Sequence, residues 1–251
     1  MITLATAEQN TKSLLFEADE TSDLSGGLAP YWLSGSCLVF TFRRQGFVLT
    51  AAHALAFGGD NPGERLRVFA HEDLSGTSLP FDKHVSVGRD IGESGDLALL
   101  RIALHQCTPE QVERVRRVDL ERLRPPECHH RPGVRVFIPG FPSDRKAIHY
   151  DENVISLGLA VHGATLSGSE GLRRIHRVTL DNPNAHASMQ GFSGAPVFGA
   201  AAAGGVRVCP SFDGVVITAP PTGTTIARFI CSSVVYAMLD GATADAPVEL
   251  L

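Results

Sequence analysis

The chain has 251 residues, of which 43% are hydrophobic and 20% are charged, and its formal net charge is −5. This length suits one large all-β domain or two small ones with a sizeable buried core. The acidic balance argues against nucleic acid as a partner. No apolar run approaches the roughly 18 residues that a membrane helix needs, so no membrane is expected as a partner.

The N-terminal segment is polar and favours a surface extension over residues 1–27. It lacks a basic start followed by an apolar core, so it does not have the pattern of a secretory signal. The cysteines are odd in number and scattered, which is typical of reduced thiols, and a cytoplasmic location is expected. These five cysteines are Cys37, Cys107, Cys128, Cys209 and Cys231.

Strand patterns dominate the chain from Ser36 onward. Short runs rich in β-branched and aromatic residues are separated by turns with glycine or proline, which favours an all-β sandwich or barrel. Between the first two runs, residues 43–46 read RRQG, a turn in which Gly46 can supply a positive φ. The predicted strands cover residues 36–42, 47–51, 65–70, 97–104, 134–138, 154–161, 174–180, 196–198, 206–209 and 214–219.

Two helices are predicted among these strands. Residues 108–111 read TPEQ, in which a Thr cap, a first-turn Pro and a Gln form a capping box, and the helix must stop before Pro125. A second helix is predicted around residues 232–239, with Gly241 as its stop. The expected domains are an N-terminal extension (1–27), a first β-barrel (28–107), a connecting helix and linker (108–126), and a second β-barrel with the C-terminal helix (127–251).

A serine lies between glycines where residues 191–196 read GFSGAP. Such a turn bends the backbone sharply and leaves room for a substrate carbonyl. The N–H groups of Gly191 and Ser193 can then point at one site and form an oxyanion hole. Taken alone, the run is equally typical of a glycine-rich turn with an incidental serine.

Two further motifs place a histidine and an aspartate beside apolar strands. Residues 47–53 read FVLTAAH and end at His53, while residues 94–100 read SGDLALL and place Asp96 ahead of a strand. Each residue alone is more often structural. A serine, a base that can activate it and an acid that can orient the base together indicate nucleophilic catalysis.

These motifs resemble those of the trypsin/chymotrypsin-like serine proteases, in the order His, Asp, Ser and at similar spacings, over residues 34–239. Residues 136–142, VFIPGFP, are similar to the family's strand and glycine turn early in the second barrel. The resemblance implies an all-β, chymotrypsin-like fold of two six-stranded antiparallel β-barrels with a connecting helix and a C-terminal helix. It implies a serine endopeptidase with His53, Asp96 and Ser193 as its triad, a protein or peptide as substrate, and no cofactor.

The chain departs from the secreted members of that family at four positions. Phe192 stands where they have an aspartate that pairs with a new N-terminus, so no such zymogen switch is expected. Ala54 and Met189 stand where they often have disulfide cysteines, in agreement with a reducing compartment. Ile217 replaces a serine that often supports the catalytic aspartate.

The resemblance places the substrate pocket beside uncharged residues, with its base at Ala187 and its walls near residues 214–219 and 224–226. A buried basic side chain would find no partner there, so a small or apolar residue is expected before the cut. Asp181 or Asp213 would change this expectation if either reached the pocket. The expected pocket residues are Ala187, Gln190, Ile217, Thr218, Ala219 and Thr225.

Other functions stay open beside the protease. An α/β-hydrolase esterase has a similar serine motif, but that fold orders its triad Ser, Asp, His and follows the serine with a helix. A non-catalytic protein-binding module on the same fold is also open, because a fold does not fix a function. The resemblance to intracellular bacterial proteases suggests stress or defence, with an attached or associated sensor or regulator as a further partner.

Residues 128–130 read CHH, but they do not predict a metal site. Adjacent side chains diverge in most backbone conformations, and no second ligand cluster has the spacing of a zinc site. No metal is therefore expected.

Overall fold

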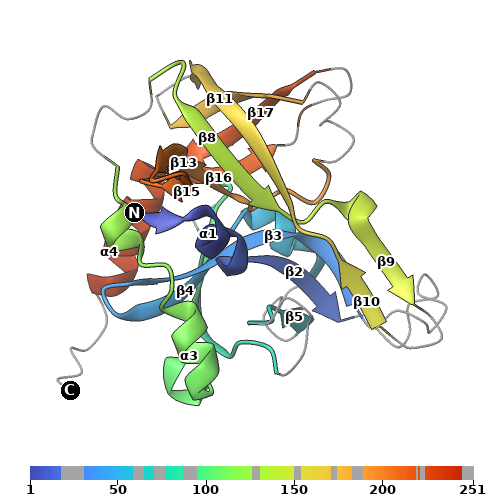
Figure 1. Ribbon diagram of the computed structural model, residues 1–251. Coiled ribbons are helices and arrows are strands. Elements are labelled where there is room, and N and C mark those ends of the chain that lie inside the picture. Colours follow the sequence, from blue (N-terminus) through green and yellow to red (C-terminus); the bar gives the residue numbers. More distant parts are fainter. Residues whose placement is uncertain are drawn as a thin grey trace.

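The computed structural model describes residues 1–17, 31–58, 65–70, 77–86, 95–125, 131–149, 154–170, 174–182, 189–218, 220 and 224–244. Two β-sheets form the body of the molecule, and the chain passes from the first to the second through a linker with a short helix (Figure 1). No helix in these ranges is long and apolar enough to cross a membrane.

The first sheet has six strands: β2 (Thr11–Glu17), β3 (Tyr31–Phe42), β4 (Gln45–Thr50), β5 (Leu66–Arg67), β6 (Phe81–Ser86) and β7 (Ala98–Ile102). Their order is β5-β2-β3-β4-β7-β6, and every neighbouring pair is antiparallel. The sheet curls so that its two ends approach one another at an isolated bridge between Phe69 and Ser78.

The second sheet is a closed barrel of six strands: β8 (Arg135–Gly140), β11 (Ala160–Glu170), β12 (Ile175–Leu180), β13 (Pro196–Gly199), β16 (Phe212–Thr218) and β17 (Ile226–Cys231). The order around the barrel is β11-β12-β17-β16-β13-β8, and antiparallel pairing of β8 with β11 closes it. The expectation of a chymotrypsin-like pair of barrels is confirmed, with the first of the two present as a curled sheet.

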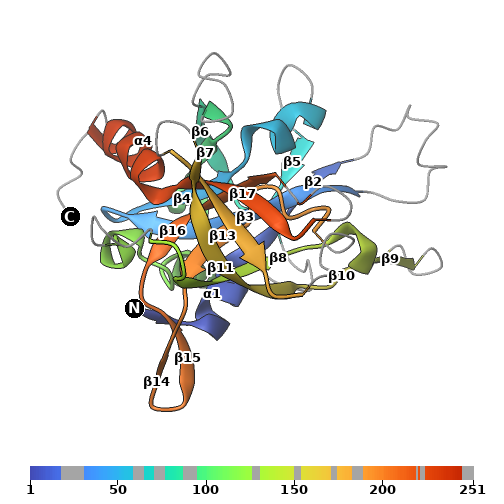
Figure 2. The same cartoon turned by 90° about the horizontal axis from the view of Figure 1, so that it is seen from above.

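Smaller elements lie around these two sheets. Two short strands, β9 (Lys146–His149) and β10 (Val154–Leu157), form a hairpin that projects from the second barrel (Figure 1). A second projection combines β14 (Ala201–Ala203) and β15 (Val206–Cys209) with β1 (Ile2–Thr3), as seen in Figure 2. The α-helices in the described residues are α1 (Leu4–Asn10), α3 (Pro109–Val115) and α4 (Ser232–Ala244).

Three apolar cores hold the fold together, and β3 contributes to two of them. Successive side chains of a strand point to opposite faces, so Cys37 and Val39 pack inside the first sheet. Leu38 and Phe40 face the other way, into a core shared with the linker, the second barrel and α4. The third core fills the closed barrel. The shared core fixes the two halves relative to each other, and the site described below depends on that placement.

The first 17 residues belong to the folded body, so the expected surface extension over residues 1–27 is wrong for this part. The strand β2 lies between β5 and β3, and residues 11–16 are buried. Lys12 and Ser13 are buried polar residues in this strand, and they break the apolar pattern that would have revealed it. Residues Ile2 and Thr3 pair with β15, so the N-terminal segment contacts both halves.

Both predicted helices are present, although their lengths differ from expectation. The capping box is confirmed, because the Gln111 backbone N–H donates to Thr108 Oγ1 and the Thr108 N–H donates to Gln111 Oε1. The helix ends at Val115, and a separate 3₁₀ turn covers Leu120–Leu123. Gly241 does not stop α4, since it is not among the glycines with positive φ and the helix continues past it.

Two local expectations about turns and strands also differ. Arg43 and Arg44 take the positive φ values in the β3–β4 turn, at 47° and 64°. Gly46 is not among the residues with positive φ, and a Cβ there would lie 2.9 Å from Leu104 Cδ2, so that side chain would have to shift. The strand predicted over residues 154–161 is divided between β10 and the start of β11.

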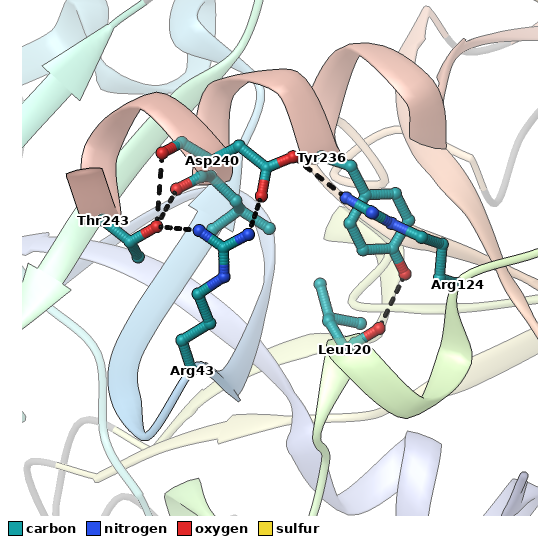
Figure 3. A network of polar contacts seen from close by, with 7 residues as sticks. Arg43, Leu120, Arg124, Tyr236, Asp240 and Thr243 are labelled. Carbon is teal, nitrogen blue, oxygen red and sulfur yellow. Dashed lines mark hydrogen bonds and ion pairs between the residues drawn. The ribbon is translucent and has the colours of Figure 1, made fainter.

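A polar network joins α4 to the β3–β4 turn and to the linker (Figure 3). Arg43 donates to Asp240 Oδ1 at 2.6 Å, and Arg124 donates to Asp240 Oδ2 at 3.1 Å. The buried Tyr236 hydroxyl donates to Leu120 O at 2.8 Å, and burial raises the pKa of this phenol. The network therefore connects three of the segments that border the shared core: α4, the linker and the end of β3.

The cysteines of the described residues are free thiols, in agreement with the expectation, while Cys128 lies outside the described residues. Burial raises the pKa of the Cys37 and Cys209 thiols to about 12. Since the thiolate is the reactive form, both should resist alkylation in the folded protein and react on unfolding.

We expect five free thiols per chain by intact-mass counting after denaturation in an alkylating agent. The same count on folded protein should be lower by at least two, because burial raises the pKa of Cys37 and Cys209. An intramolecular disulfide in protein prepared under non-oxidising conditions would contradict the expectation of a reducing compartment.

Candidate active site

His53 and Asp96 lie side by side because β4 and β7 are paired. The register sets Thr50 opposite Ala98, so the end of β4 adjoins the start of β7. The His53 backbone N–H donates to Asp96 Oδ1 at 2.8 Å, and His53 Nδ1 lies 2.5 Å from Asp96 Oδ2. This arrangement places the ring proton on Nδ1, which leaves Nε2 as the basic nitrogen.

Ser193 lies in the turn before β13, and its backbone packs against the first sheet. Its carbonyl accepts from the Ser36 N–H at 2.8 Å, while the Gly194 N–H donates to Val216 O at 2.8 Å. Gly194 has φ +86°, and a Cβ there would lie 2.2 Å from Thr50 Oγ1. The serine turn therefore lies against the end of β4, next to the segment that carries His53.

Among the described residues, no hydrogen bond joins Ser193 Oγ to the His53 ring. The His53 side chain keeps 47% of its surface exposed, so its Nε2 edge is accessible to a substrate.

The turn before Ser193 has two backbone donors, the N–H groups of Gly191 and Ser193, whose directions follow from neighbouring hydrogen bonds. The Gln190 carbonyl accepts from the Ser143 N–H at 2.7 Å, and the Phe192 carbonyl accepts from the Ala195 N–H at 2.8 Å. A trans peptide points its N–H away from its C=O, so these bonds fix the directions of the Gly191 and Ser193 N–H groups. Within the described residues, neither N–H donates to a backbone acceptor. Both are available to an oxyanion.

Ser36 is a site residue that the sequence analysis missed. It is fully buried on β3, and its hydroxyl donates to Gly191 O at 2.8 Å and accepts from the Phe141 N–H at 2.9 Å. The only sequence signal is a polar residue at the start of the run 36–42. Such a serine is common in strands, so the signal does not distinguish it.

Phe192 is fully buried inside the second barrel. Its ring packs against Gly140, where a Cβ would lie 2.6 Å from Phe192 Cδ1, and against His162 at 5.0 Å between ring centroids. Burial lowers the pKa of His162, which favours its neutral form. The surroundings of Phe192 are thus suited to an apolar side chain.

We expect the 251-residue chain to need no proteolytic trimming for peptidase activity, because Phe192 offers no carboxylate to a new N-terminal ammonium. Removal of residues 1–17 should abolish activity, since it removes the inner strand β2. Peptidase assays on the intact and trimmed chains under identical conditions check both statements. Activity confined to a processed chain would contradict this interpretation of Phe192.

The six expected pocket residues fall in different surroundings. Gln190 and Thr218 are exposed, and Thr225 is half-buried with its carbonyl accepting from the Leu180 N–H. Ile217 is buried in the core shared by the two halves, which differs from a residue lining an open pocket. Ala187 and Ala219 lie outside the described residues.

The two aspartates that could have added a negative charge to the expected pocket have other contacts. Asp181 is exposed and forms a two-point ion pair with Arg135, with Arg135 Nη1 2.7 Å from Asp181 Oδ1. Asp213 is fully buried and accepts from Ser211 Oγ at 2.8 Å. In the described ranges there is no group of three or more metal-ligating side chains, and residues 128–130 lie outside them.

Solved structures match this chain over almost its whole length, whereas no protein-family model and no curated protein sequence matches it. A mutant of human heparin binding protein (CAP37) covers 100% of this chain and 98% of its own, with a TM-score of 0.62 and 15% identity. A thermostable serine protease, AL20, from an extremophilic microorganism covers 96% and 100%, with a TM-score of 0.57 and 12% identity.

A third match is the Rv3671c protease from M. tuberculosis in its active form. It covers 98% of this chain and 86% of its own, with a TM-score of 0.53 and 16% identity. Together these likenesses show that the chain has the chymotrypsin-like fold of the trypsin/chymotrypsin-like serine proteases.

Proposed function

We propose that the protein is a serine endopeptidase that hydrolyses peptide bonds through an acyl-enzyme, with His53, Asp96 and Ser193 as its triad. The observation that carries this proposal is the two-point contact of His53 with Asp96, beside a serine turn with two available backbone donors. These groups come from both halves of the fold, and they supply a nucleophile, a base, an orienting acid and an oxyanion site.

The proposed mechanism uses His53 first as a base and then as an acid in each half-reaction. Ser193 Oγ attacks the peptide carbonyl while His53 Nε2 takes the hydroxyl proton. The Gly191 and Ser193 N–H groups stabilise the oxyanion of the tetrahedral intermediate. His53 then gives its proton to the leaving amine. The same imidazole then takes a proton from water, the resulting hydroxide attacks the acyl carbonyl, and the imidazolium returns the proton to Ser193 Oγ as the acid product leaves. Asp96 stabilises the imidazolium in both steps.

Labelling with a serine-reactive fluorophosphonate tests the proposal. We expect one adduct per folded chain, located at Ser193 by peptide mass spectrometry, because only an activated serine reacts at a useful rate. Heat-denatured protein serves as the control and should not be labelled. Absence of labelling in folded protein would contradict the proposal.

A non-catalytic binding module is the second candidate function, and one comparison favours it. One match on the same fold is named as a heparin binding protein. The net charge of −5 makes a polyanion such as heparin a poor ligand here, so a protein partner fits this candidate better. An esterase on an α/β-hydrolase fold is contradicted by the chymotrypsin-like architecture.

The setting that we propose is the cytoplasm of a bacterium, in stress or defence, with an attached or associated sensor or regulator. The free thiols among the described cysteines support a reducing compartment. The role in stress or defence rests on the resemblance to intracellular bacterial proteases. Comparing the proteins cleaved in cells with the parent chain and with Ser193→Ala would test this role.

The proposed specificity is for a small, aliphatic or aromatic residue before the cut. An uncharged pocket gains about 25 cal/mol for each Å² of apolar surface removed from water, whereas a charged side chain would be desolvated without a partner. The ion pair of Asp181 with Arg135 and the burial of Asp213 support this. Ranking kcat/KM over peptides that differ only in that residue checks it, and a top rank for Arg or Lys would contradict it.

A further inference from the structure

We propose that Ser36 is a positioning residue, whose hydroxyl holds the carbonyl of Gly191 and so fixes the oxyanion hole. This inference rests on the proposed function of the site. Ser36 lies on β3 of the first sheet, and the oxyanion turn belongs to the second half.

The polar groups of Ser36 all bond to residues around the site, although the residue is fully buried. Its N–H donates to Ser193 O at 2.8 Å, and its carbonyl accepts from Thr50 Oγ1 at 2.9 Å. Its hydroxyl contacts Phe141 N at 2.9 Å and Gly191 O at 2.8 Å. One strand residue thus connects the nucleophile's turn, the end of β4 and the segment that follows β8.

The direction of the hydroxyl proton follows from its two partners. A serine hydroxyl has one proton to donate and lone pairs that accept. The Phe141 backbone N–H can only donate, so the hydroxyl oxygen accepts from it. The Gly191 carbonyl can only accept, so the hydroxyl proton points to it. The hydroxyl therefore acts as a donor to Gly191 and as an acceptor from Phe141, and these two roles cannot be reversed.

Gly191 needs such a constraint because its own backbone is permissive. It has φ +95°, and a Cβ there would lie 2.3 Å from Phe141 O, so only glycine fits. Glycine reaches many φ/ψ regions at little cost, and intrinsic preference therefore does not hold this conformation. The hydroxyl of Ser36 and the Ser143 N–H hold two successive carbonyls, those of Gly191 and Gln190.

Removal of the hydroxyl would leave Gly191 O and Phe141 N without the partner each has now. Unsatisfied buried polar groups are costly, so the turn would gain by rotating its peptides toward other partners. Such a rotation would change ψ of Gly191 and φ of Phe192, and so displace the two adjoining peptides, which carry the Gly191 and Ser193 N–H groups. The ground state of a bound substrate would change little, because these N–H groups act mainly on charge that develops in the transition state.

Ser36→Ala tests the inference, with kcat and KM measured per active site titrated by fluorophosphonate. We expect kcat to fall roughly tenfold to a hundredfold. Complete loss of one oxyanion donor lowers kcat by about 10²–10³-fold, and a donor that is only displaced should lower kcat by less. KM should stay within about threefold. The inhibition constant of a substrate-like peptide aldehyde should rise by about the factor lost in kcat, because its adduct carries the oxyanion.

Thr11→Val is the matched control. Thr11 is also fully buried in the first sheet, and its hydroxyl donates to Ala7 O at 2.9 Å, away from the site. Its kcat per active site should equal that of the parent. A parent-like kcat in Ser36→Ala, or an equal loss in Thr11→Val, would overturn the inference.

Ser36→Cys covers the case in which Ser36→Ala does not fold. A thiol is close in shape to the hydroxyl but a weak donor, so kcat should fall while KM is unchanged, and parent-like turnover would overturn the inference. A parent chain without Ser193-dependent turnover would instead overturn the proposed function, and this inference with it.

Discussion

Ser193→Ala should abolish peptide hydrolysis while the protein stays folded. The substitution removes only the attacking oxygen, and the turn keeps its backbone hydrogen bonds to Ser36 N–H and Val216 O. Loss of a triad member in this mechanism typically lowers kcat by ~10⁴-fold or more, which is about 5 kcal/mol of transition-state stabilisation. Steady-state turnover of a peptide library, with a thermal melt of the same samples, measures both parts of the expectation.

Ser167→Ala is the matched control for this substitution. It removes a serine hydroxyl from β11 of the same half, where the hydroxyl is exposed and bonds to Thr179 Oγ1 at 2.9 Å. Its turnover should equal that of the parent. If Ser193→Ala retained activity within tenfold of the parent, the assignment of the nucleophile would be wrong.

The two-sheet architecture can be predicted from the sequence, because many strands of this chain are short apolar runs between turn residues. The run 36–42 corresponds to the second part of β3, and the run 196–198 to β13. Strands cannot be predicted in this way where tertiary contacts override the local pattern. The strand β2 contains two buried polar residues, Lys12 and Ser13. A prediction that takes only apolar residues to be buried does not recognise such a strand.

The candidate catalytic residues are recognisable in the sequence because each is a residue type used in nucleophilic catalysis and each lies beside a strand or a glycine turn. His53, Asp96 and Ser193 each adjoin a strand or a glycine turn, so their motifs are visible in the sequence. Ser36 has no such mark, because its role depends on Phe141 and Gly191, which lie more than a hundred residues away along the chain. Contacts of that kind become visible only when the two halves are docked.

The docking of the two halves determines how the parts of the site lie relative to each other. The linker and α4 lie along both halves (Figure 1), and the network around Asp240 joins α4 to the β3–β4 turn (Figure 3). His53 follows β4, whereas Ser193 precedes β13 of the closed barrel. The contacts around Ser36 and Gly194 make the position of the serine turn dependent on the first sheet. The site is therefore assembled by the interface and not by either sheet alone.

Asp96→Asn should lower kcat about as severely as loss of the nucleophile, by ~10⁴-fold. The asparagine keeps the shape of the side chain, and its carbonyl oxygen can still accept from the His53 backbone N–H, as Asp96 Oδ1 does at 2.8 Å. The amide NH₂ then faces His53 Nδ1, where a carboxylate oxygen lies now. Since an NH₂ group can only donate, the ring must carry its proton on Nε2, and Nε2 can no longer take the proton of Ser193.

Asp82→Asn provides the control for this substitution. Asp82 is a carboxylate on β6 of the same sheet, and it pairs with Arg101 at 2.7 Å, away from His53. A half-exposed pair of this kind contributes little to stability, so turnover per active site should match that of the parent. A second observable is the tautomer itself, since the His53 ring proton in Asp96→Asn should appear on Nε2 in ¹⁵N spectra of the imidazole. A ring proton that stays on Nδ1 in Asp96→Asn would show that the carboxylate is not what orients the base.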